Sequence, residues 1–358
     1  MKLNPLISVL SRSCSSHLAS RTAAPSWTAL KAQSSQRTYS AQTAGTISLR
    51  RSYLYVPASS ERMLQKSLVT KSDTIIYDLE DSVAPSEADK SSARERLVNF
   101  LTTTSAEKLP CPERIAIRLN ATDTPFFERD INEALRIPSV RTFILPKVHS
   151  SQELHVVSSA IDASGRAGDP IRLVASIESA RALWNLGNIA NWASAHGNSG
   201  GQLAALLFAA EDYCADTSII RTPSRQELLY TRSKIAVAAK AFGLEAIDMV
   251  CVNYKDLAYL KEECEDGRRL GFTGKQAIHP TQVEMIQSTF VPSAQEILRA
   301  AKITHQMAQA HASQRGAVGL ELGDGNGGRE MIDAPMLKQA ENTIKIARAA
   351  GLEIPQFV

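Results

Sequence analysis

The sequence lacks several features that define common classes of protein. It contains no apolar run near the roughly 20 residues that cross a bilayer, and the apolar segment 203–210 leads directly into Glu211. Its five cysteines are scattered without a Cys-x-x-Cys pair, which is typical of free thiols in a reducing compartment. No HxH or HExxH pattern occurs among the seven histidines. The sequence therefore predicts neither a membrane span, a disulfide framework nor a zinc site.

Acidic residues are absent from the first sixty positions, and Glu61 is the first of them. This leader carries Arg and Lys among many serines, the composition of an organellar transit peptide. Arg37 stands three residues before Ser40, as in a matrix-protease cleavage site, so residues 1–39 are predicted to be removed in mitochondria. They hold five of the 40 Lys and Arg residues and none of the 37 acids, so the remainder has a net charge near −2. The basicity belongs to the leader and gives no support for nucleic acid binding.

From residue 50 onward, short apolar segments alternate with helical patterns. The expected strands are 52–56, 74–79, 114–119, 142–145, 171–177, 204–208, 246–252 and 275–278. Eight strand-then-helix units favour a (β/α)₈ TIM barrel over residues 40–290. An open doubly wound sheet is the alternative, but no GxGxxG follows any expected strand. Helices are expected after capping boxes at Ser224 and Ser293, and the helix after Glu178 is expected to lay Leu183 and Trp184 against the sheet.

Two of the apolar strands stop on a carboxylate. The strand 171–177 ends at Glu178, and the strand 204–208 is followed by Glu211 and Asp212. The carboxyl ends of parallel strands meet at one rim, where barrel enzymes carry their chemistry. Carboxylate oxygens from neighbouring strands suit a hard divalent cation. Glu178 and Asp212 are therefore predicted to hold Mg²⁺; a helix-capping role for either acid is the alternative.

A C-terminal extension, residues 291–358, follows the expected barrel. A helix from Ser293 leads into a glycine-dense segment, 316–328, and Pro335 begins a final helix with Leu337, Ala340, Ile344 and Ala347 on one face. A glycine-rich hinge between two helices is what a closing lid requires. A tail packed on the barrel through a loose linker is the alternative.

An ordered set of motifs resembles the HpcH/HpaI aldolase and citrate lyase β-subunit superfamily, in particular its mitochondrial citrate lyase β-like branch. The motifs occupy residues 55–57, 78–83, 118–120, 145–148, 177–179, 211–212, 271–280 and 331–335. The resemblance implies a Mg²⁺-dependent acyl-CoA lyase with a TIM barrel. It further implies a homotrimer in which the lid of one subunit covers the site of its neighbour. For the mitochondrial branch it implies cleavage of citramalyl-CoA to acetyl-CoA and the 2-oxo acid pyruvate, with malate-synthase-like condensation as a side activity.

The resemblance also implies roles for individual residues. Asp333 matches the lid aspartate that exchanges a proton with the acetyl-CoA methyl carbon. Arg118 is expected to steady a carboxylate or enolate-like oxygen, with an ion pair to Glu80 as the alternative. Glu80 and Asp81 are expected to bind the waters around the metal. The residues expected to bind coenzyme A are Tyr55, Arg62, Lys66, Ile278 and His279, and Lys147 is a further candidate to face the site.

Other functions remain open from the sequence. The same site would suit malyl-CoA or citryl-CoA cleavage. Pyruvate-handling barrels share rim carboxylates of this kind but need no coenzyme A. A non-catalytic CoA-binding subunit would not need Arg118, Glu178, Asp212 and Asp333 together.

Overall fold

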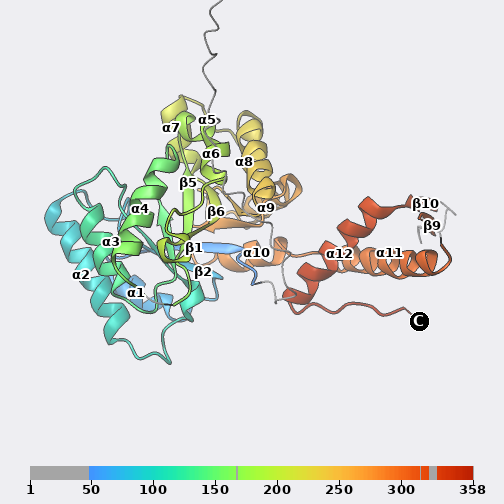
Figure 1. The fold of residues 1–358 in the computed structure, drawn as a ribbon, viewed down its shortest axis with the longest axis horizontal. Helices are drawn as coiled ribbons and strands as arrows, with labels where there is room; N and C mark the ends of the chain where they lie inside the picture. Colours follow the sequence, from blue (N-terminus) through green and yellow to red (C-terminus); the bar gives the residue numbers. More distant parts are fainter. Residues whose placement is uncertain (1–47, 167, 315, 322–328, 358) are drawn as a thin grey trace, which may run out of the picture. The chain divides into compact units, whose positions relative to one another are not determined.

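The alternation of strands and helices is present in the computed structural model, which describes residues 48–166, 168–314, 316–321 and 329–357. In these residues eight parallel strands pair in sequence order, and the eighth closes on the first (Figure 1). The strands are β1 (Ser52–Pro57), β2 (Thr74–Asp78), β3 (Ile115–Arg118), β4 (Thr142–Leu145), β5 (Arg172–Ile177), β6 (Gln202–Phe208), β7 (Glu245–Asp248) and β8 (Gly274–Ala277). The predicted barrel is confirmed, and the open sheet is excluded.

Helices surround the strands (Figure 1). They are α1 (Glu61–Ser67), α2 (Glu87–Thr103), α3 (Phe127–Leu135), α4 (Ser151–Ala163), α5 (Ala180–Trp184), α6 (Leu186–Ala190), α7 (Ala210–Thr217), α8 (Leu229–Ala241), α9 (Leu257–Leu270) and α10 (Gln282–Thr289), with short 3₁₀ turns η1 (Pro112–Arg114), η2 (Gly197–Gly200) and η3 (Gln226–Leu228). None of the described helices combines the length and apolarity that a membrane span requires.

Two apolar clusters follow from the period of the strands, because successive side chains point to opposite faces. A small cluster takes one buried residue from most strands, including Ile76, Ile144, Val174 and Leu207, and fills the barrel interior. A larger cluster lies between the strands and the helices. The interior cluster fills the barrel as a packed core, so no open channel runs through it.

Two local expectations were wrong. The helix after Glu178 breaks at Asn185 into α5 and α6, and Trp184 is 87% exposed instead of facing the sheet. The capping box at Ser224 is absent, because Glu227 accepts hydrogen bonds from the amide and hydroxyl of Thr222. The capping box at Ser293 is confirmed, with both of its reciprocal hydrogen bonds in place.

The C-terminal extension forms a helical hairpin of α11 (Ala294–Ala312) and α12 (Ala334–Ala349). A two-stranded antiparallel sheet that the sequence did not predict pairs β9 (Val318–Glu321), inside the glycine-dense segment, with β10 (Arg329–Ile332) just after it. The hairpin has its own apolar cluster of Ala300, Ile303, Met307, Ile332 and Ala340. The predicted leader, 1–39, and the centre of the predicted lid, 322–328, lie outside the described residues.

Candidate active site

An arginine and an aspartate lie side by side at the ends of β2 and β3. The strand register pairs Asp78 with Arg118. The guanidinium donates from Nε to Asp78 Oδ1 at 2.6 Å and from Nη2 to Oδ2 at 2.7 Å. Burial by itself would raise the pKa of Asp78, but the charge and hydrogen bonds of Arg118 outweigh it and hold the pKa below its ordinary value. This bidentate pair fixes the plane of the guanidinium at the mouth of the barrel.

The remaining nitrogen of Arg118 contacts the loop that follows β2. Its Nη1 lies 2.9 Å from Glu80 Oε2 and 3.0 Å from Asp81 Oδ2. The amides of Glu80 and Ser82 donate to the carboxylate of Asp78, so the loop folds around that aspartate. The ion pair between Arg118 and Glu80 that the sequence left open is present, and Arg118, Glu80 and Asp81 converge as expected.

Tyr55 supports the guanidinium from the first strand. Its ring centroid lies 4.8 Å from Arg118 Cζ, a cation–π distance, and its hydroxyl donates to Gln276 Oε1 at 3.0 Å. Burial raises the pKa of Tyr55, which keeps this hydroxyl a donor. Gln276 donates in turn to the main-chain oxygens of Phe208 and Asp248. The contact with coenzyme A expected of Tyr55 remains a prediction, while its recorded contacts are with Arg118 and Gln276.

Lys147 follows β4 and joins two of the carboxylates. Its backbone is left-handed, with φ of +51°, a conformation that few residues other than glycine adopt. Its main-chain amide donates to Glu178 Oε1 at 2.7 Å, and its Nζ donates to Glu80 Oε1 at 2.6 Å. Glu80 is therefore bound through both oxygens, by Lys147 on one and by Arg118 on the other.

Glu178 and Asp212 occupy the rim as the sequence predicted. Glu178 directly follows β5 and is buried; burial, reinforced by the charge of Asp212, raises its pKa to about 7. Asp212 lies in the first turn of α7, and burial with the nearby charge of Asp81 raises its pKa. The capping alternative fails for Glu178, because the cap of α5 is Ser179. The charge of Asp212 lies close enough to Glu178 to raise the free energy of its ionised form.

The site carries an excess of negative charge. When all are ionised, the five carboxylates of Asp78, Glu80, Asp81, Glu178 and Asp212 outnumber the nearby cations Arg118, Lys147 and Lys90. The described residues hold no group of three or more His, Cys, Asp or Glu side chains arranged around a metal position. Two carboxylates completed by water or substrate oxygens is a coordination that Mg²⁺ accepts. The donor set therefore fits a divalent cation at Glu178 and Asp212.

The residues predicted to bind coenzyme A come from two places. Arg62 and Lys66 are exposed one turn apart on α1. Ile278 is 42% exposed in the loop after β8, and the ring of His279 stacks on Tyr254 with centroids 4.9 Å apart. His279 Nδ1 also pairs with Thr281 Oγ1 at 2.8 Å, a hydrogen bond within the loop itself.

Asp333 caps α12, where its carboxylate accepts a hydrogen bond from the amide of Met336 at 3.3 Å. Within the described residues it has no hydrogen bond or ion pair with the rim carboxylates. The single chain therefore gives Asp333 a capping role, and its catalytic role stays a prediction.

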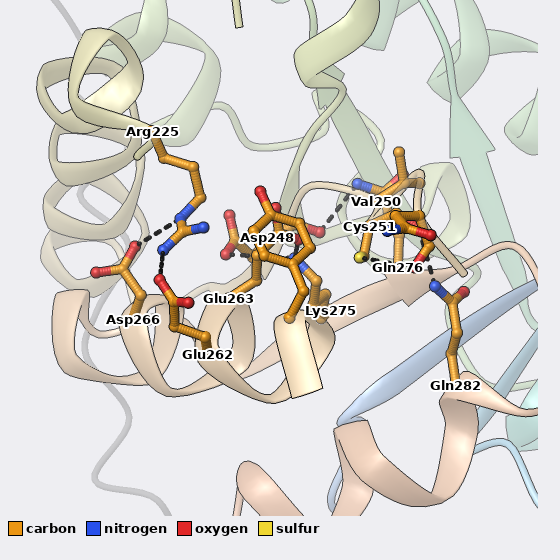
Figure 2. Close-up of polar contacts among 12 residues, drawn as sticks. Arg225, Asp248, Val250, Cys251, Glu262, Glu263, Asp266, Lys275, Gln276 and Gln282 are labelled. Carbon is orange, nitrogen blue, oxygen red and sulfur yellow. Dashed lines mark hydrogen bonds and ion pairs between the residues drawn. The ribbon is translucent and has the colours of Figure 1, made fainter. Parts of the chain in front are cut away.

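A buried charge network lies behind β7 and β8, against α8 and α9 (Figure 2). The fully buried Lys275 Nζ lies 3.1 Å from Glu263 Oε2 and 3.9 Å from Asp248 Oδ2, and Arg232 Nη2 lies 2.7 Å from the same Asp248 oxygen. Gly267 makes room for it, because a Cβ there would stand 2.5 Å from Asp248 Oδ2. The network holds β7 and β8 against α8 and α9, and the loops at the rim follow these two strands.

One side-chain amide joins the loop after β7 to the loop of Ile278 and His279. Gln282 accepts from the amides of both residues at 2.8 and 3.2 Å, and it donates to Cys251 O at 2.9 Å (Figure 2). Because Gln282 is fully buried, these bonds hold the loops after β7 and β8 in a fixed relation.

Sequence reasoning did not assign Asp78 to the site and named Lys147 only as a candidate to face it, with no specific role. The signal for Asp78 was its place at the end of β2, next to the strand that ends at Arg118. Only the register of the two strands shows that these residues pair. Lys147 had no comparable signal, because the left-handed backbone that directs its amide to Glu178 is not encoded by a glycine or asparagine.

Comparisons with known proteins agree with this geometry. Residues 51–280 match the family model of the HpcH/HpaI aldolase/citrate lyase proteins. The chain is 32% identical over 308 residues to citrate lyase subunit beta of Leuconostoc mesenteroides subsp. cremoris, covering 85% of this chain and 95% of that protein. It is also 32% identical over 305 residues to the mitochondrial citramalyl-CoA lyase of Homo sapiens, covering 83% of this chain and 85% of that protein.

This chain also resembles a solved structure that contains ligands. The protein CitE of Mycobacterium tuberculosis, crystallised with magnesium, acetoacetate and coenzyme A, superposes with a TM-score of 0.63 at 28% identity. The match covers 85% of this chain and 98% of that one.

Proposed function

The chain belongs to the HpcH/HpaI aldolase/citrate lyase family of carbon–carbon lyases, and we propose that it cleaves citramalyl-CoA to acetyl-CoA and pyruvate with Mg²⁺ as cofactor. The observation that carries the proposal is the pair of rim carboxylates, the buried Glu178 and the more exposed Asp212, inside a cluster with an excess of negative charge. The likeness to a human citramalyl-CoA lyase and to a structure holding magnesium and coenzyme A supports it.

The reaction breaks the bond between the thioester α carbon and the carbinol carbon. The hydroxyl loses its proton and becomes the ketone of pyruvate, while the α carbon gains a proton and becomes the methyl of acetyl-CoA. Proton loss and gain balance, so no water or further reactant is consumed. Bound at Glu178 and Asp212, Mg²⁺ would supply Lewis-acid stabilisation of the hydroxyl oxygen and the adjacent carboxylate.

The side chains of the cluster supply the remaining functions. Arg118, held rigid by Asp78 and Tyr55, presents a fixed cation to a developing oxyanion or carboxylate. Glu80 and Asp81 orient the waters around the cation. Asp333 provides the proton for the α carbon from the lid of a neighbouring subunit in a homotrimer, because a carboxylate exchanges a proton with carbon efficiently only when it is desolvated.

The remaining assignments belong to the same proposal. Arg62, Lys66, Ile278, His279 and Tyr55 line the path of coenzyme A. Residues 1–39 are a mitochondrial leader, 40–290 the catalytic barrel and 291–358 the lid extension, and the mature enzyme works in the matrix. The bacterial citrate lyase subunit and the human mitochondrial lyase are each 32% identical to this chain, so citryl-CoA is the second candidate substrate. Malyl-CoA cleavage and condensation to malate are side activities.

The test is acetyl-CoA release from citramalyl-, malyl- and citryl-CoA, measured side by side with Mg²⁺ and with EDTA. We expect citramalyl-CoA to be preferred and Asp212→Ala to lower kcat by at least about a hundredfold, since even residues that only orient metal ligands are worth 10–100-fold. Asp216→Asn is the matched control, because Asp216 lies in the same helix, is exposed and keeps its acceptor for Ala180 N. Full activity in EDTA, or an active Asp212→Ala protein, would contradict the metal assignment.

A further inference from the structure

Lys147 contacts two separate acids of the carboxylate cluster, Glu80 and Glu178. Lys147 follows β4, between the loop of β2 that carries Glu80 and the end of β5 that carries Glu178. A turn that only had to change the direction of the chain would be served at lower cost by glycine or asparagine. At Lys147 the left-handed backbone directs the amide to Glu178 while the side chain reaches Glu80, so the backbone direction and the side chain are both used.

The two contacts of Lys147 act on different carboxylates. The amide, at 2.7 Å, fixes one oxygen of Glu178 and so sets the direction in which that carboxylate faces the rim. The ammonium, at 2.6 Å, occupies Glu80 Oε1 while Arg118 Nη1 occupies Oε2 at 2.9 Å. Each oxygen of Glu80 is thus held by a cationic side chain, although Glu80 lies among the acids that a metal ion would attract.

We propose that Lys147 is a positioning residue that sets the number of protein oxygens on the bound cation, aligning Glu178 as a ligand and withholding Glu80. Two protein ligands leave coordination positions for the hydroxyl and carboxylate of the substrate, whereas a third would occupy one of them. This inference rests on the proposed function, because it concerns the same cation.

The proposal predicts opposite changes in metal affinity and turnover. Lys147→Met removes the ammonium and keeps the backbone amide, so Glu80 becomes free to join the cation and one nearby positive charge is lost. At an effective dielectric between those of protein and water, that charge corresponds to roughly tenfold tighter Mg²⁺ binding. We expect calorimetric titration to show this gain while kcat falls by about tenfold. A residue with only a structural role would not raise affinity and lower turnover together.

Two further variants separate the side chain from the backbone. Lys147→Gly removes the ammonium and also relaxes the left-handed backbone, so Glu178 loses its fixed direction. We expect its kcat to fall below that of Lys147→Met, with no loss of thermal stability. Ser218→Gly is the matched control, since Ser218 is left-handed with φ of +59° and exposed beyond α7, and its release should leave Mg²⁺ affinity and kcat unchanged.

The outcomes distinguish this inference from the proposed function. If the wild-type protein binds Mg²⁺, Asp212→Ala does not, and Lys147→Met binds with wild-type or weaker affinity, the role of Lys147 is refuted and the proposed function stands. If the wild-type protein binds no Mg²⁺, both are refuted. Tighter binding with lower kcat in Lys147→Met supports both.

Discussion

Glu178 carries a stability cost that its replacement would reveal. Burial and the charge of Asp212 raise its pKa from 4.5 to about 7, so the folded protein holds the proton more tightly than the unfolded chain. Each pKa unit corresponds to about 1.4 kcal/mol, which makes ionised Glu178 cost about 3 kcal/mol of folding free energy at pH 8. The cost grows as the pH rises from about 4.5 to about 7, and at pH 5 it is about 1 kcal/mol.

Glu178→Gln removes this cost and keeps an acceptor for the amide of Lys147. In EDTA we expect the variant to be more stable than the wild-type protein by up to about 3 kcal/mol at pH 8 and by about 1 kcal/mol at pH 5. With saturating Mg²⁺ the order should reverse, because the cation stabilises only the protein that binds it. Urea unfolding at both pH values, with and without Mg²⁺, measures all four differences.

Glu107→Gln, at an exposed loop position, is the control for replacing a carboxylate and should change stability by no more than about 0.5 kcal/mol. The reasoning is refuted if Glu178→Gln is less stable than the wild-type protein in EDTA at pH 8, or if its advantage does not depend on pH.

Two other changes test the surroundings of the site. Asp248→Asn leaves the buried cations Lys275 and Arg232 short of a negative partner, so we expect urea unfolding to show that the free energy of unfolding falls by about 3–5 kcal/mol. Glu265→Gln, which changes a carboxylate at the surface, is the control and should change it little. A fall below about 1 kcal/mol in Asp248→Asn would mean that the network is not energetically coupled. Arg118→Lys cannot reproduce the bidentate pair with Asp78, so kcat should fall by about a hundredfold while the melting temperature changes little. A near-normal kcat would show that Arg118 takes no part in the reaction.

The barrel could be predicted from the sequence because its strands are short apolar segments of similar spacing, each followed by a helix. The placement of Glu178 and Asp212 at the rim followed from the same pattern, since parallel strands bring their carboxyl ends together, whereas Glu80 and Asp81 came from the family resemblance. Local detail was less predictable. Asn185 breaks a helix that apolar spacing alone would continue, and Trp184 then faces solvent.

Contacts that depend on register or on unusual backbone angles could not be predicted. The pairing of Asp78 with Arg118 depends on the register of β2 against β3, which the sequence alone does not reveal. The bridge made by Lys147 requires a positive φ at a residue that normally avoids it. The hydrogen bond between Tyr55 and Gln276 requires the barrel to close, because the two residues are 221 positions apart and meet only where β1 pairs with β8.

The apolar cluster inside the C-terminal hairpin affects how the protein opens. Its members come from α11, β10 and α12, so their packing does not depend on the strands of the barrel. The hairpin is thus a cooperative unit with its own local unfolding free energy. A subglobal opening of this unit would withdraw Asp333 and expose the hairpin amides to exchange, while the eight-stranded domain retained its acids, its fold and its capacity to hold a ligand.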